Sequence, residues 1–202
     1  MSTISIRNNF PEVAARLNQL GTDIGNKAVV RALNTTIDQG KTQMARQISQ
    51  EFRVSVGTAK DRLKVYKASA RNGAFRLVAT LEATRKDPGR SMNLIAFVTK
   101  GKVSKASAKR SGRTDLAGQL QFQIKRAGGK KSIKGAFVGN MGRTVFIRTG
   151  KERLPIKALN TIDIGQMFNT RRVNKVVKQV MLDKFPANFQ RELRAVLQGY
   201  AR

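Results

Sequence analysis

Residues 23–52 read DIGNKAVVRALNTTIDQGKTQMARQISQEF, and this stretch decides the fold. Apolar side chains recur in it at helical spacing, while Asn, Thr, Gln, Lys and Arg fill the positions between them. The apolar set is Ile24, Ala28, Leu33, Ile37, Met44, Ile48 and Phe52. The spacing places these side chains on one helix face, so it predicts one long helix over the whole stretch. Gly40 is its weak point, because an interior glycine costs about 1 kcal/mol relative to alanine.

Shorter helical patterns lie on both sides of this stretch. Residues 10–20 predict a short helix, since their apolar side chains also recur at helical spacing. A further short helix is predicted to start after Ser55 or Thr58 and to run through Leu63. Residues 1–70 are therefore expected to form an N-terminal helical region.

The apolar pattern alternates after this region. Alternation predicts strands, with Phe75, Leu77, Ala79 and Leu81 on one face of the first. The predicted strands are residues 74–82, 92–98, 120–125, 136–138 and 144–148, with turns at residues 87–89 and 139–142. Residues 71–164 are expected to form an antiparallel β region, interrupted by a basic loop over residues 100–118.

The helical period returns from about Gly165. An apolar stripe runs to Phe185, Pro186 is expected to break the helix, and a last short helix is predicted to follow through Tyr200. Residues 165–202 should therefore form C-terminal amphipathic helices. The order of helices, strands and helices predicts an α+β fold in one domain overall, with a central antiparallel sheet.

The charge balance is extreme for a chain that can form a core. Of its 202 residues, 40% are hydrophobic, and 40 Lys and Arg against 12 Asp and Glu give a formal net charge of +28. Such an excess repels itself in the compact state. It persists most easily where an anionic polymer, an acidic protein or a membrane surface screens it, and nucleic acid is the first candidate.

Several kinds of active site are disfavoured by the composition. The chain has no Cys and no His, so disulfides, thiolate metal sites and the usual general base are excluded. The acids are scattered, without the clustering that a magnesium nuclease needs beside a phosphate. They include Asp61, Glu82, Asp87, Asp115, Glu152, Asp163 and Asp183. We therefore predict a protein that is not an enzyme and that takes no metal or cofactor.

No segment approaches the roughly 20 consecutive apolar residues of a spanning helix. Residues 1–7, MSTISIR, also lack the shape of a signal peptide. We expect no membrane partner, and a protein used in a cytoplasm-like compartment or in a particle assembled there.

Two basic tracts are candidates for contact with a polyanion. Residues 100–113 read KGKVSKASAKRSGR and residues 125–134 read KRAGGKKSIK. Small residues between the cations let the backbone follow a phosphate chain, and the absence of aromatic residues disfavours base stacking. The candidate contacts with DNA are Lys100, Lys102, Lys105, Lys109, Arg110, Arg113, Lys125, Arg126, Lys130, Lys131 and Lys134. The open alternative is a solvated loop that serves solubility or docks on an acidic subunit.

A sharper pattern follows the second tract. Residues 135–138 read GAFV and residues 145–156 read VFIRTGKERLPI. On spacing alone this is a hairpin with a basic edge, and Phe146 is predicted to lie on the strand face that joins the core. The combination resembles the prophage minor tail protein Z family, the tail completion proteins of lambda-like phages. The residues that match are Phe146, Arg148, Gly150, Arg153, Pro155 and Ile156, which we interpret as fold or subunit-interface residues.

The sharp motif spans about residues 135–156. With a helical N-terminus that contains residues 29–34, VVRALN, a basic middle and a C-terminal helix pair, the resemblance covers nearly the whole chain. Residues 100–113 depart from it and receive no family role. The resemblance implies a virion protein at the head-proximal end of a non-contractile tail, assembled in the host cytoplasm. The implied partners are the tail terminator, the head-tail connector and phage genomic DNA. A homo-oligomer, as a hexameric ring, is also implied.

Two other functions stay open at this point. A free non-specific nucleic-acid-binding protein is supported by charge alone, and would bind as a monomer with steep salt dependence. An enzyme on nucleic acid would require metal-dependent cleavage. The pattern at residues 145–156 favours the tail protein over both.

Overall fold

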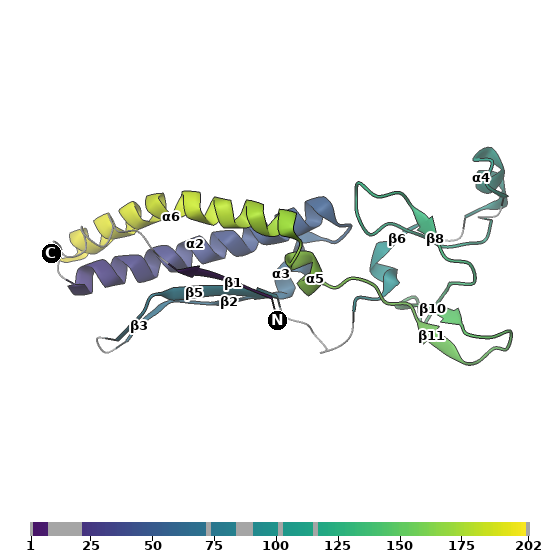
Figure 1. The fold of residues 1–202 in the computed structure, drawn as a ribbon, viewed down its shortest axis with the longest axis horizontal. Helices are drawn as coiled ribbons and strands as arrows, with labels where there is room; N and C mark the ends of the chain where they lie inside the picture. The colour runs from purple at the N-terminus through teal and green to yellow at the C-terminus, as the bar shows by residue number, and fades with distance from the viewer. Residues whose placement is uncertain are drawn as a thin grey trace.

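The molecule is elongated, with a helical body at one end and small sheets at the other (Figure 1). The computed structural model describes residues 2–7, 22–71, 74–83, 91–100, 103–114 and 117–200. The helix expected over residues 10–20 and the turn expected at residues 87–89 lie outside them. The mixed fold, with two long helices and several small antiparallel sheets, confirms the predicted α+β class.

The body has three layers: helix α6 (Arg171–Tyr200), helix α2 (Thr22–Glu51) and a three-stranded sheet. Helix α2 is the middle layer and contacts both α6 and the sheet (Figure 1). It supplies Leu33, Ile37, Met44 and Ile48 to the core between these layers, and all four are fully buried. The long helix predicted from residues 23–52 is thus confirmed.

The sheet of the body has the order β1-β5-β2, and both pairings are antiparallel. Strand β5 (Val78–Ala83) lies in the centre, between β1 (Ser2–Arg7) and β2 (Leu63–Tyr66). Ala79, Leu81 and Ala83 of β5 are buried, as their alternation predicts. These side chains form the sheet's contribution to the core.

Several elements of this sheet differ from the predictions. Strand β1 was not predicted, and the expected helix through Leu63 is shorter: α3 (Val56–Asp61) begins after its N-cap Ser55. The predicted strand over residues 74–82 is divided into β4 (Ala74–Arg76) and β5. Strand β4 pairs with β3 (Ser69–Arg71) in a separate two-stranded sheet. The residues predicted as one strand therefore belong to two different sheets.

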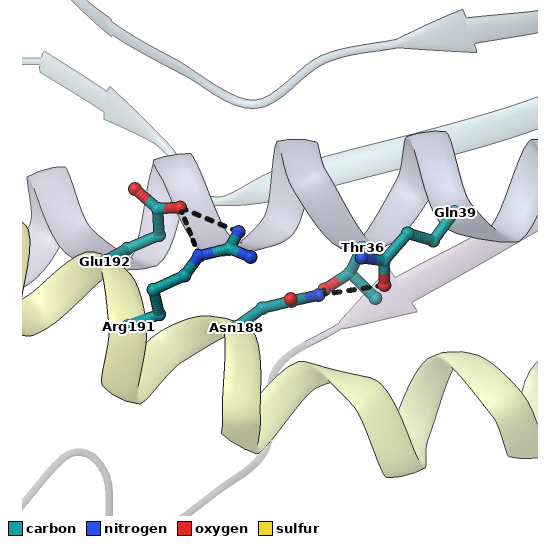
Figure 2. Close-up of polar contacts among 5 residues, drawn as sticks. All are labelled: Thr36, Gln39, Asn188, Arg191 and Glu192. Carbon is teal, nitrogen blue, oxygen red and sulfur yellow. Dashed lines mark hydrogen bonds and ion pairs between the residues drawn. The ribbon is translucent and has the colours of Figure 1, made fainter.

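Buried polar groups link α2 to α6. Asn188 donates from Nδ2 to Thr36 Oγ1 at 2.9 Å and to Gln39 Oε1 at 3.1 Å (Figure 2). Thr36 is fully buried and Asn188 almost so. Figure 2 also shows Arg191 paired with the adjacent Glu192 at 3.0 Å. Because an unpaired buried amide is costly, the Asn188 bonds favour one register of the two helices.

The expected break at Pro186 is wrong, because α6 continues through it to Tyr200. Proline removes the bond that residue 186 would donate to the Leu182 carbonyl. Both residues lie on the exposed side of α6, where water can satisfy that carbonyl. Phe185 and Phe189 lie on either side of the proline in the sequence. Both are buried, and their stacked rings have centroids 6.2 Å apart. Their burial holds the helix to the core on both sides of residue 186.

The second predicted strand, residues 92–98, is also wrong over most of its length. It contains a short 3-10 helix, η1 (Leu94–Phe97), followed by strand β6 (Val98–Lys100). Asn93 accepts from Ile95 N at 3.1 Å and thereby caps η1. A turn of this kind places residues three apart on one side, and both Leu94 and Phe97 are buried.

The distal end carries two three-stranded sheets. One has the order β6-β7-β8, where β7 (Gln121–Phe122) is much shorter than the strand predicted over residues 120–125, and β8 is Lys131–Ser132. The other has the order β11-β10-β9, with β9 Phe137–Gly139, β10 Thr144–Arg148 and β11 Ile156–Ala158. The predicted hairpin of β9 and β10 is confirmed, with Asn140 and Met141 in its turn at positive φ.

Two short helices complete the fold. Helix α4 (Lys105–Arg110) lies within the predicted basic loop. Helix α5 (Ile164–Phe168) precedes α6, and Asp163 and Gln166 form a capping box at its start. Phe168 of α5 is fully buried in the core. The chain from residue 164 onward therefore returns from the distal end to the body.

Candidate functional site

The distal part of the sequence is far poorer in acids than the rest. Residues 91–160 contain 16 Lys and Arg but two acids, Asp115 and Glu152, so they carry a net charge of +14 (16 minus 2) out of +28. The described residues of this segment form the end of the molecule away from the C-terminal part of α6 (Figure 1). Half of the excess charge is thus concentrated on small sheets and loops.

Helix α4 projects from the distal end (Figure 1). Ser104 caps it by accepting from Ser107 N at 3.2 Å, and Gly112 ends it with a φ of +67°. Two backbone hydrogen bonds of Val103 close the base of this loop. Val103 N donates to Gln119 O at 3.0 Å, and Val103 O accepts from Gly118 N at 2.8 Å. The basic tract is therefore a folded projection on a fixed base.

The predicted contact residues of this projection lie on its surface. The side chains of Lys105, Lys109, Arg110 and Arg113 are all exposed. Lys100 ends strand β6, and Lys102 lies outside the described residues. Ala108 is the buried residue of α4, and it lies outside the main core. The projection presents its cations to the surroundings and contributes little to the core of the molecule.

All five cations of the second tract are exposed, and two of them, Lys125 and Arg126, also contact the end of α2. Arg126 bonds the end of α2 twice, from its backbone N to Glu51 O at 2.9 Å and from Nε to Ser49 O at 2.7 Å. Lys125 Nζ lies 3.9 Å from Glu51 Oε1 and 5.8 Å from the Phe52 ring centroid. Arginine near a helix C-terminus satisfies carbonyls that have no helical partner. These two predicted contact residues thus join the distal end to the body.

The remaining cations of this tract, Lys130, Lys131 and Lys134, are exposed on and around strand β8. No exposed large apolar side chain occurs in the described parts of either basic tract. Surfaces of this composition suit the phosphate oxygens of a nucleic acid, because such contacts need positive charge and do not need an apolar pocket. The exposed cations of the two tracts are therefore candidates for contact with a polyanion.

The family-pattern residues form a different kind of surface. Phe146 of β10 pairs directly with Phe137 of β9, with ring centroids 6.0 Å apart. The Arg148 guanidinium lies 4.9 Å from the Phe137 ring centroid, and Arg148 pairs with Ile156 of β11. Residues paired directly across strands share a face, so these four side chains lie together. Gly139 leaves space there, since a Cβ would be 3.1 Å from the Phe146 ring.

This arrangement corrects the prediction that Phe146 faces the core. The buried residue of β10 is its neighbour Val145, which is fully inaccessible, whereas Phe146 is half-buried on the opposite face. Consecutive strand residues alternate between faces, so one of the two must point outward. The continuous apolar run VFI gave no signal of which residue that is.

The loop between β10 and β11 holds the other family-pattern residues. Thr149 closes it by donating from N and Oγ1 to Pro155 O at 3.2 and 3.1 Å. Gly150, Arg153 and Pro155 are exposed. No heavy atom lies within 4 Å of a Cβ built on Gly150, so the described chain does not require glycine there. Gly150 and Arg153 are therefore outside the core of the single chain, whereas Pro155 helps to close the loop through its carbonyl.

Sequence reasoning missed the exposed apolar residues at this end. Leu154 is 66% exposed and Met141 is 95% exposed, each in a hairpin loop. Leu154 stands between Arg153 and Pro155 in a stretch without apolar neighbours before it. That isolation was the available signal, because a lone leucine in a polar turn has no strand face to occupy.

The described residues contain no group of three or more acids, Cys or His placed to hold a metal ion. Among them, no helix combines the length and the apolar character that crossing a bilayer requires. A family model described as prophage minor tail protein Z (GPZ) matches residues 11–199. No curated protein and no solved structure matches the chain.

Proposed function

This chain belongs to the prophage minor tail protein Z family, and from that premise we propose that it completes the head-proximal end of a non-contractile phage tail. The family match covers nearly the whole chain and makes it a structural component of a phage tail, located in the virion. The proposal adds the position in the tail, the joining of tail to head, and contact with the DNA that passes between them. It assigns no catalytic step.

The observation that supports DNA contact is the basic distal end. Lys105, Lys109, Arg110 and Arg113 on the α4 projection, with Lys130, Lys131 and Lys134 nearby in sequence, are exposed cations. They lie in a segment that contains two acids. Phosphate contacts of this kind would bind duplex DNA without reading its sequence. A tail protein that meets DNA of every sequence needs contacts of that type.

The proposed assembly is a hexameric ring next to the tail terminator and the head-tail connector. Copies that each carry a net charge of +28 repel one another unless a polyanion or acidic neighbours screen them. DNA in a central channel would supply that screening on the inside. Acidic surfaces of neighbouring virion proteins would supply it on the outside.

Electron microscopy of purified tails, with an antibody or a small tag on this chain, tests the proposal. The expected label lies at the head-proximal end of each tail, in tails with and without attached heads. A label at the opposite end would contradict the proposed position. A chain found in the soluble fraction and absent from particles would instead favour the free nucleic-acid-binding protein.

A further inference from the structure

The outward face of the β11-β10-β9 sheet combines aromatic, aliphatic and cationic groups. Phe137 and Phe146 lie side by side with Arg148 against Phe137, and Ile156 is placed beside Arg148 by strand pairing. Ile156 is 40% exposed even though it lies in a strand. Mixed surfaces of aromatic residues and arginine are typical of the central part of protein–protein interfaces.

The adjoining loop extends this surface. Leu154 projects from it with two thirds of its surface exposed. The loop is closed by the two bonds from Thr149 to Pro155 O, so Leu154 is presented on a tethered backbone. Tethering reduces the entropy lost when such a side chain is immobilised by a partner. Leu154 therefore has the placement of an anchor residue.

The charge around Leu154 selects the chemistry of the partner. Arg148, Lys151, Arg153 and Lys157 are exposed around the loop, against a single acid, Glu152. A second copy of this strongly basic chain would bring like charge to this face, so contacts between the copies of the proposed ring are expected elsewhere on the surface. Duplex DNA offers phosphates but no pocket for a leucine, and a leucine cannot stack on bases as an aromatic ring does. An acidic protein segment that carries apolar side chains would pair with the cations and also cover the exposed Leu154 side chain.

We propose that the outward face of β9, β10 and β11, with Leu154 as its anchor, docks on an acidic and partly apolar segment of a different virion protein. The inference rests on the proposed tail function and separates two surfaces of the distal end. The α4 projection contacts DNA, and the β10–β11 hairpin contacts protein. Family-pattern residues that the single chain does not require, Gly150 and Arg153 among them, would act in this contact.

Site-specific photo-cross-linking in assembled particles tests the docking surface. The photoreactive amino acid p-benzoylphenylalanine replaces Leu154 in the full chain, and the matched control places it at Leu182 on α6, which is 41% exposed. Particles are purified, irradiated and digested, and cross-linked peptides are identified by mass spectrometry. We expect an adduct from position 154 to another virion protein, in a segment of net negative charge, which position 182 does not reach.

Other outcomes would overturn the inference. An adduct at position 154 to DNA or to a second copy of this chain contradicts the proposed partner. No adduct, in particles that contain the substituted chain, contradicts the contact itself. A wild-type chain absent from particles refutes the proposed tail function, and the docking partner with it.

A charge reversal gives a second readout that does not depend on cross-linking. Arg153→Glu should lower the amount of chain incorporated into tails about tenfold, as expected for loss of an interface hot spot. Glu152→Lys, at the adjacent exposed position, should leave incorporation unchanged or raise it. Circular dichroism of both variants checks the fold. Equal losses for the two variants would contradict an acidic partner.

Discussion

The sulfur of Met181 lies 2.6 Å from the point that a Cβ atom on Gly40 would occupy. Cε and Cγ of the same side chain lie 2.7 and 2.9 Å from that point. Met181 is almost fully buried in α6, opposite the middle of α2. The glycine that weakens α2 as an isolated helix is therefore the residue that lets α6 pack closely against it.

Substitution of Gly40 tests this packing directly. Gly40→Ala should lower the free energy of unfolding by up to about 2 kcal/mol, since overpacking costs about 1–3 kcal/mol and helix propensity returns about 1 kcal/mol. In a Met181→Ala background the same change should become stabilising, because the space is then free. Urea denaturation measures both. Gly199→Ala in α6, with no atom within 4 Å of the new Cβ, is the control and should not destabilise.

The polar contact between the long helices gives a second prediction. Asn188→Leu should cost about 1–3 kcal/mol, because it leaves the buried Thr36 hydroxyl without its amide donor. Adding Thr36→Val should recover part of that loss, since both polar partners are then removed. Additive losses in the double variant, measured by urea denaturation, would show that the two residues are not coupled.

Two neighbouring residues of β10 should respond very differently to the same substitution. Val145→Asp buries an unpaired charge and should cost about 3 kcal/mol or more, whereas Phe146→Asp places the charge on the outward face and should cost about 1–2 kcal/mol. Thermal melting followed by circular dichroism measures both. A larger loss for Phe146→Asp would restore the original prediction that Phe146 faces the core.

The basic residues of the second tract should separate into structural and binding groups. Arg126→Gln should destabilise the chain by about 1–2 kcal/mol through loss of the bond from Nε to Ser49 O. Lys130→Gln removes the same charge at another exposed position of the tract, on the loop before strand β8, and should leave stability unchanged. In DNA binding the order should reverse, with the larger loss for Lys130→Gln. The same order in both assays would contradict this division.

The long helix α2 and the central strand β5 of the body were predictable, because burial on one face imposes a period on the sequence. The continuation of α6 through Pro186 was not, since it depends on Phe185 and Phe189 packing on the body from both sides of the proline. The turn at η1 was also hidden, because a short continuous apolar run fits a strand and a helix equally well.

The candidate site was predictable in charge and not in geometry. Composition located the basic tracts, and the α4 projection presents the cations expected there. Composition could not show that Arg126 bonds α2, because Arg126 and Lys130 are both exposed cations of one tract. The difference between them depends on contacts between residues about 77 positions apart in the sequence, as in the bond from Arg126 to Ser49. The outward orientation of Phe146 likewise depends on the pairing of strands β9 and β10, which places Phe146 beside Phe137.

The most direct test of DNA contact by the distal end compares two variants of equal charge. One replaces Lys105, Lys109, Arg110 and Arg113 by Gln, and the other replaces Arg171, Arg172, Lys175 and Lys178 on the exposed surface of α6. The measurement is the slope of log affinity for duplex DNA against log salt concentration. Each lost phosphate contact lowers that slope by about 0.9.

Binding through the α4 projection predicts that the first variant lowers the slope by about 2–4 and the second by less than about 1. Unchanged circular dichroism confirms that both variants are folded. Equal changes in slope would show that DNA responds to total charge, and an unchanged slope in the first variant would contradict contact between the projection and DNA.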